Sequence, residues 1–191
     1  MPRAPVGGVK RYVILAMVVT AWVLPLQCAT LERLSLDDMI ARSTTIVHGK
    51  VTASWAALTG SVIYTHYQIQ VREQFKGVGR NSVEIMTPGG TVNGMKSSFS
   101  GSPVLNQGDE FVFFLWTSKS GITWIMGLTQ GLFSLPPGAP GADRVATRTA
   151  SRELMLDPAT SRPVKDSALT MNLSELRSRI AATLAAQGGV K

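Results

Sequence analysis

The chain is poor in the residues on which most enzymes and metalloproteins rely. Of its 191 residues, one is cysteine (Cys28) and two are histidine (His48 and His66). A single cysteine excludes an internal disulfide, so packing alone must hold the fold. The sequence contains neither a Gly-x-Ser-x-Gly nor a His-Glu-x-x-His motif, and a nucleophile–His–acid triad has only these two histidines available. We therefore expect a protein that is not an enzyme and has no cofactor.

Long apolar runs are also scarce. Residues 12–26 form one, but it is shorter than the ~20 residues that a membrane-spanning helix needs. Basic residues precede this run and small residues follow it, an order typical of a secretory signal peptide. We assign residues 1–29 to a signal peptide and expect export to the periplasm or the extracellular space, with no membrane span in the mature chain. Cleavage after Cys28 or Ala29 is favoured over a lipid anchor at Cys28, because Gln27 fits a lipoprotein signal poorly.

The mature chain also lacks a strong excess of positive charge. Sixteen of the 19 Lys and Arg residues and all 12 acidic residues follow residue 29, which gives the mature chain a formal charge of +4. Residues 30–135 carry eight basic and seven acidic residues and are nearly neutral. A nucleic-acid-binding domain needs clustered basic residues. We therefore expect no nucleic acid as a partner.

The residues present predict a mainly β body. A short helix begins at Ser35, where Asp38 completes a capping box, and ends near Ser43. Alternating apolar residues predict a strand from Thr45 to about Ala53 and a clear one over Ile63–Arg72, joined by a loop from Ser54 to Ser61. Further strands are predicted over residues 82–87, 110–116, 122–126 and 131–135. The strand over 110–116 is apolar on both faces, which is typical of a central, covered strand.

The candidate binding residues lie in one loop and on one strand face. The segment from Thr91 to Gln107 is rich in Gly and Ser, and long loops of this kind in small domains are usually functional. A short strand within it is predicted over residues 97–99. The polar face of the strand over residues 63–72 carries Tyr64 and Arg72. The candidate binding residues are therefore Gly89, Gly90, Asn93, Ser97 and Ser98 of the loop, with Tyr64 and Arg72 of the strand. Trp55, Trp116 and Trp124 are interpreted as core or rim residues.

The two histidines suggest an alternative chemistry. His48 and His66 fall on the polar faces of consecutive predicted strands. If the pairing register makes them neighbours, they form part of a metal site with a carboxylate from a loop. The alternative interpretation is that of two ordinary solvent-facing histidines. The metal hypothesis implies a small metal-binding protein or a metal-dependent hydrolase.

The C-terminal part of the chain is predicted to be an extension of the body. Proline and glycine mark residues 136–143 as a linker. Short strands are predicted over 144–148 and 153–156. An amphipathic helix is predicted from Leu173 to Ala186, capped by Asn172. The domains are thus a signal peptide (1–29), a β-barrel body (30–135), a linker (136–143) and a C-terminal extension (144–191).

The order of these elements is familiar. A capped helix leads into Ile46-Val47-His48-Gly49, and a strand of the form Tyr-x-x-Tyr-x-Ile-x-Val ends in Phe75-Lys76-Gly77. Over Ser35–Leu135 this pattern resembles an uncharacterised family of small exported bacterial proteins. It is also similar to the netrin-type module of the tissue inhibitors of metalloproteinases, which is an OB-like barrel. That family reaches the protease zinc through an N-terminal Cys-x-Cys, whereas here Ala29 and Thr30 follow Cys28.

The resemblance therefore implies an OB-like antiparallel β-barrel with a short N-terminal helix and a C-terminal amphipathic helix. For function we expect an exported, non-enzymatic interaction module for an unidentified protein partner, with a protease-inhibitor-like role implied by the resemblance alone. The alternatives are the metal-binding protein described above and a structural component of the cell envelope.

Overall fold

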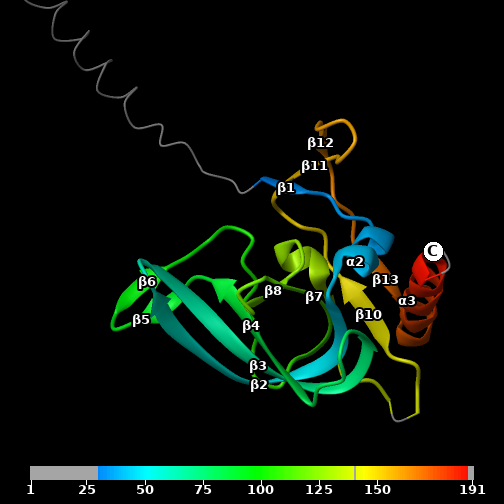
Figure 1. The fold of residues 1–191 in the computed structure, drawn as a ribbon, viewed down its shortest axis with the longest axis horizontal. Coiled ribbons are helices and arrows are strands. Elements are labelled where there is room, and N and C mark those ends of the chain that lie inside the picture. Colours follow the sequence, from blue (N-terminus) through cyan, green and yellow to red (C-terminus); the bar gives the residue numbers. More distant parts are fainter. Residues whose placement is uncertain (1–29, 140, 189–191) are drawn as a thin grey trace, which may run out of the picture.

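The computed structural model describes residues 30–139 and 141–188, and is dominated by one curled, mainly antiparallel sheet (Figure 1). The predicted signal peptide and Cys28 lie outside these residues. The helix α2 (Leu36–Arg42) begins with the predicted capping box, in which the Ser35 side chain accepts from the Asp38 amide. This box satisfies amides that the first helical turn otherwise leaves without a partner.

A long hairpin forms the centre of the sheet. It consists of β2 (Thr45–Thr59) and β3 (Val62–Lys76). The predicted loop from Ser54 to Ser61 is wrong, because both strands continue to a turn at Gly60 and Ser61. Residues 53–59 lack regular apolar alternation since many of them are exposed at this end of the hairpin. The sequence signal therefore ends before the strand does.

The other strands pair around this hairpin. The sheet has the order β13-β10-β9-β7-β2-β3-β4-β8, and β7 pairs with β8 in addition. The link between β4 and β8 is a single residue pair, Met86 with Trp124, so the sheet curls strongly without full closure. The other strands of this sheet are β4 (Ser82–Pro88), β7 (Glu110–Thr117), β8 (Thr123–Ile125), β9 (Leu132–Ser134), β10 (Val145–Arg148) and β13 (Leu169–Asn172).

Two smaller sheets complete the β structure. β5 (Gly90–Val92) and β6 (Met95–Ser97) form a hairpin within the segment predicted as a loop. β1 (Thr30–Glu32), β11 (Leu154–Leu156) and β12 (Pro163–Val164) form the other sheet, in which β1 and β11 are parallel. In Figure 1 the β5–β6 hairpin lies at one end of the sheet and the helices at the other.

The strand β7 separates two apolar cores, as its two apolar faces predicted. Phe113 and Leu115 pack inside the curled sheet, and Val112 and Phe114 pack on the other side toward the helices. The helix α3 (Leu173–Gly188) closes this second core with the fully or nearly fully buried Leu173, Leu176 and Ile180. The amide of Ser174 in its first turn donates to Asp143 of the linker, a capping role that the sequence assigned to Asn172.

Candidate functional site

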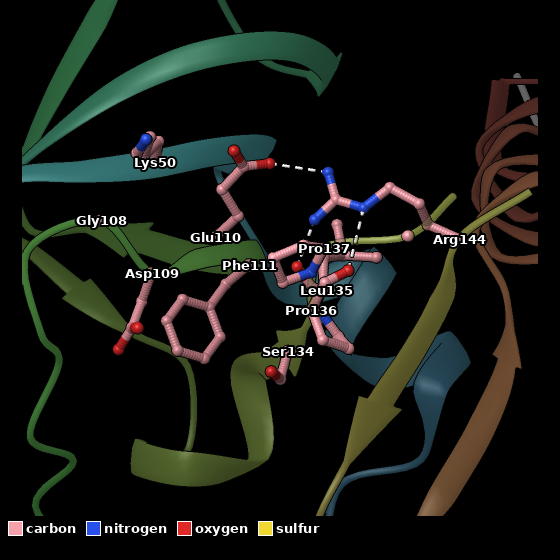
Figure 2. Close-up of a pocket in the computed structure, with 11 residues that line it drawn as sticks. Lys50, Gly108, Asp109, Glu110, Phe111, Ser134, Leu135, Pro136, Pro137 and Arg144 are labelled. Carbon is pink, nitrogen blue, oxygen red and sulfur yellow. Dashed lines mark hydrogen bonds and ion pairs between the residues drawn. The ribbon is translucent and has the colours of Figure 1, made fainter. Parts of the chain in front are cut away.

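A cavity of about 600 Å³ lies where the linker meets β7, and Figure 2 shows its lining. Arg144 points across it and donates to Glu110 Oε2 at 2.7 Å. The same guanidinium also donates to the carbonyl oxygens of Leu135 and Pro136. The same carboxylate oxygen of Glu110 also lies 3.1 Å from His48 Nε2. The polar groups of this cluster therefore bind one another.

The electrostatics of Glu110 agree with a structural role. Burial raises the pKa of Glu110, but the hydrogen bonds from Arg144 and His48 outweigh burial and leave the pKa below its usual value. Glu110 thus remains ionised and holds the guanidinium of Arg144, the residue that follows the linker. We interpret the cluster as a brace that fastens residues 136–144 to the sheet.

The structure does not bring the two histidines together. On β2, His48 is opposite Glu73 of β3, whereas His66 is opposite Trp55, seven residues further along β2. At ~3.3 Å per residue this places them roughly 20 Å apart along the strand. Each histidine has its own carboxylate, and His66 Nδ1 lies 2.8 Å from Glu84 Oε1. His48 is also 9% exposed, so it is not the solvent-facing residue that the strand pattern suggested.

A second cavity of about 350 Å³ coincides with the loop that the sequence predicted to bind. We call it the rim cavity. It lies between the inner face of the β2–β3 hairpin and the segment 87–105. Its lining consists of Ser54, Thr65, Tyr67, Thr87, Pro88, Gly89, Gly90, Thr91, Lys96, Ser97, Ser98, Phe99, Ser102, Pro103, Val104 and Leu105. Hydroxyl and apolar groups predominate in this lining.

Hydrogen bonds hold the segment around the rim cavity in place. The Ser102 hydroxyl donates to the Pro88 carbonyl at 2.7 Å, and the Thr65 hydroxyl donates to the Gly89 carbonyl at 2.7 Å. At the base, the Leu105 amide donates to the Tyr67 hydroxyl at 3.4 Å. The cavity is therefore built by the fold before any ligand arrives, which lowers the entropic cost of binding.

Gly90 brings the β5–β6 hairpin close to the long hairpin. Its φ of +139° favours glycine, and a Cβ at this position would lie 2.7 Å from Thr65 Oγ1 and 3.0 Å from Ala56 Cβ. A larger residue would push β5 away from β3. Gly90 thus sets the shape of the rim cavity through its backbone.

The predicted binding residues fall into three groups. Gly89, Gly90, Ser97 and Ser98 line the rim cavity. Asn93 instead has a φ of +50° in the two-residue turn between β5 and β6. Tyr64 and Arg72 are absent from the residues that line the cavity, and the ring of Tyr64 contacts Trp124.

Sequence reasoning did not select the apolar lip of the rim cavity. Phe99 is 47% exposed and Val104 is 83% exposed, and both line the cavity. An aromatic residue and a valine in an otherwise polar segment are a signal that the sequence does contain. Of the three tryptophans interpreted as core or rim residues, Trp55 and Trp116 are 43% and 44% exposed, so neither belongs to the core.

Residues 30–139 and 141–188 contain no group of three or more His, Cys, Asp or Glu side chains placed to hold a metal ion. Within the same ranges, no helix has the length and apolar character required to cross a membrane. Comparisons of the chain with protein-family models, curated proteins and solved structures find no significant match.

Proposed function

We propose that this protein is an exported, non-enzymatic interaction module that binds a segment of a protein partner at the rim cavity. The observation that carries the proposal is the preformed cavity of about 350 Å³ with the exposed side chains of Phe99 and Val104 at its lip. Exposed apolar side chains beside a concave, hydrogen-bonded wall are typical of recognition sites.

The lining of the cavity favours binding over catalysis. Its hydroxyls belong to serine, threonine and tyrosine, but none of the residues that line it is a His, Asp or Glu. A serine or threonine nucleophile needs an adjacent base to be activated. The lining therefore supports recognition, since its hydroxyls can bind the backbone of an extended segment.

Charge suggests the kind of segment. Lys96 is the single charged residue among those that line the rim cavity. A segment that carries a carboxylate beside an apolar side chain would complement Lys96 and the Phe99–Val104 lip. We propose such a segment as the ligand, and a protease is one class of partner, as the netrin-type resemblance implies.

We also propose that the body is an OB-like barrel. This is supported by the strand order β7-β2-β3-β4-β8, with an additional β7–β8 pairing and a parallel contact between β4 and β8. The mouth of a small barrel is a common place for a ligand. The signal peptide in residues 1–29 brings the module to partners outside the cytoplasm.

The test is capture of a partner by the purified exported protein. A C-terminal tag is used on the wild type, on a Phe99→Ser/Val104→Ser variant and on Val78→Ser as the control. Val78 is 76% exposed in the turn after β3 and does not line the rim cavity. We expect a partner, identified by mass spectrometry, that the control retains and the lip variant loses at least tenfold. Equal capture by all three proteins would contradict the proposal.

A further inference from the structure

The tryptophans of the described residues form a single row across the sheet. Four tryptophans occur in the chain, and Trp22 lies outside the described residues. The other three belong to one line of directly opposite residues on five neighbouring strands. In strand order β2, β3, β4, β8, β7 the line is Trp55, His66, Met86, Trp124, Trp116. We call these five residues the tryptophan row.

The tryptophan row points away from the core of the curled sheet. Directly opposite residues project to the same face, and successive residues of a strand project to opposite faces. The neighbours of the row in sequence, Tyr67, Ile85, Leu115 and Ile125, are buried in the inner core. The row therefore lies on the outer face, where the indoles of Trp55 and Trp116 at its two ends are exposed and Met86 between them is buried.

Rings in and beside the row contact one another. Trp55 stacks on His66 with ring centroids 5.2 Å apart and an interplanar angle of 11°. Tyr64 meets Trp124 edge-to-face at 5.6 Å. Such contacts restrain the rings, so a ligand would meet a rigid surface and lose little side-chain entropy on binding.

The tryptophan row is distinct from the rim cavity. Ser54, Thr65 and Thr87 line the cavity, and each directly precedes or follows a member of the row in sequence. Because successive residues alternate in direction, the two sites lie on opposite faces of the same strands. A partner in the rim cavity leaves the row uncovered.

The charge near the row indicates which class of ligand can stack on it. Glu84 is half-exposed, and its Oε1 lies 2.8 Å from His66 Nδ1. Within the described part of the chain, Glu84 Oε2 has no hydrogen bond, and the row itself contains no Lys or Arg. Nucleic acids need a basic groove beside the stacking rings, whereas an amino group is attracted both by a carboxylate and by an indole face.

We propose that the tryptophan row is a stacking surface for a chain of amino sugars. The faces of the sugar rings would lie on Trp55 and on the pair Trp124 and Trp116, and an ammonium or hydroxyl group would donate to Glu84. Four strand spacings separate the ends of the row, roughly 19 Å along the curved sheet. The ligand is therefore an oligosaccharide and not a single sugar.

Tryptophan fluorescence tests the proposal directly, because every tryptophan after the predicted signal peptide belongs to the row. The purified exported protein is titrated with a glucosamine hexamer, with its N-acetylated counterpart and with an oligogalacturonate as the acidic comparison. We expect saturable quenching by the glucosamine hexamer, weaker binding of the neutral oligomer and none of the acidic one. Absence of saturable quenching, or tightest binding of the acidic oligomer, would overturn the proposal.

Variants separate this site from the rim cavity. We expect Trp55→Ala and Trp116→Ala each to weaken binding of the glucosamine hexamer at least tenfold by calorimetry, while circular dichroism and the urea midpoint verify the fold. Glu84→Gln leaves the stacking rings intact, and we expect it to remove the preference for the amino sugar. Phe99→Ser is the matched control on the opposite face and should bind sugar like the wild type. Unchanged sugar binding in both tryptophan variants would refute the site without affecting the proposal for the rim cavity.

Discussion

Arg148 and Asp166 form a two-pronged ion pair whose side chains are only 3% and 2% exposed. The two Nη atoms of the arginine donate to the two carboxylate oxygens at 3.1 and 2.9 Å. Asp166 also accepts from the Ser151 amide at 2.8 Å. The pair thereby fixes both ends of the segment from Ser151 to Asp166, which contains β11 and β12, to the strand β10.

Removal of one partner of this ion pair should lower the free energy of unfolding. Asp166→Ala leaves the buried guanidinium of Arg148 without its counter-ion, a change that typically lowers the free energy of unfolding by about 3–5 kcal/mol. Urea denaturation of the purified protein measures this loss. Lys165→Ala is the control, because Lys165 is the exposed neighbour in sequence. A loss equal to that of the control would show that the pair does not stabilise the fold.

Acid should weaken the attachment of α3. Hydrogen bonds from Arg179 and Thr183 lower the pKa of Asp37, and a hydrogen bond from Arg177 lowers that of Glu73. A carboxyl group with a depressed folded-state pKa stabilises the fold above its unfolded pKa, and this stability is lost as the pH falls through the folded value. The unfolded values are 3.8 and 4.5. We therefore expect the free energy of unfolding to fall below about pH 4.5.

The control for this pH dependence removes the cations. In an Arg177→Gln/Arg179→Gln variant, Asp37 and Glu73 lose their arginine partners, and their pKa values should shift toward those of the unfolded chain, although Asp37 keeps its hydrogen bond from Thr183. Urea titrations between pH 3 and pH 7 should then give a flatter acid limb than in the wild type. Parallel curves for the two proteins would assign the acid sensitivity to other groups.

Gly90→Ala should destabilise the protein more than Gly94→Ala. A Cβ at Gly90 would meet Thr65 and Ala56, whereas nothing lies within 4 Å of a Cβ at Gly94. Both glycines have positive φ, so both substitutions carry backbone strain. The clash at Gly90 should add about 1–3 kcal/mol. Urea midpoints of the two variants measure the difference, and a similar loss in both would mean that β5 is free to shift.

Lys76→Met should loosen the contact between α2 and β3. Lys76 Nζ donates to the Ile40 and Ala41 carbonyls at 2.8 and 2.9 Å, near the end of the helix, and burial lowers the pKa of this amine. Loss of hydrogen bonds from a charged donor should cost about 1–3 kcal/mol. Lys119→Met in the exposed turn after β7 is the control, and the measurement is again the free energy of unfolding. Equal stability of the two variants would contradict this role for Lys76.

The Gly/Ser-rich segment at the rim cavity shows what local sequence patterns can and cannot predict. Four of the residues that the sequence selected in and beside the Gly/Ser-rich segment, Gly89, Gly90, Ser97 and Ser98, line the rim cavity. The hairpin within it was missed, although Asn93-Gly94 is the dipeptide that two-residue turns favour. Asn93 therefore belongs to the turn, whereas the exposed Phe99 and Val104 line the rim cavity.

Periodicity by itself determined the capped helix α2, the long strand β3, the doubly apolar strand β7 and the buried stripe of α3. These features depend on residues close in sequence, because capping and alternation are local. Only the tertiary structure decided which residues lie side by side. The turn at Gly60 and Ser61 sets the β2–β3 register, which places His48 and His66 apart and Trp55 beside His66. The fold then adds Trp124 and Trp116 from strands that begin more than fifty residues after β2 ends. Such long-range register depends on the packing of the whole sheet, which no local window of the sequence contains.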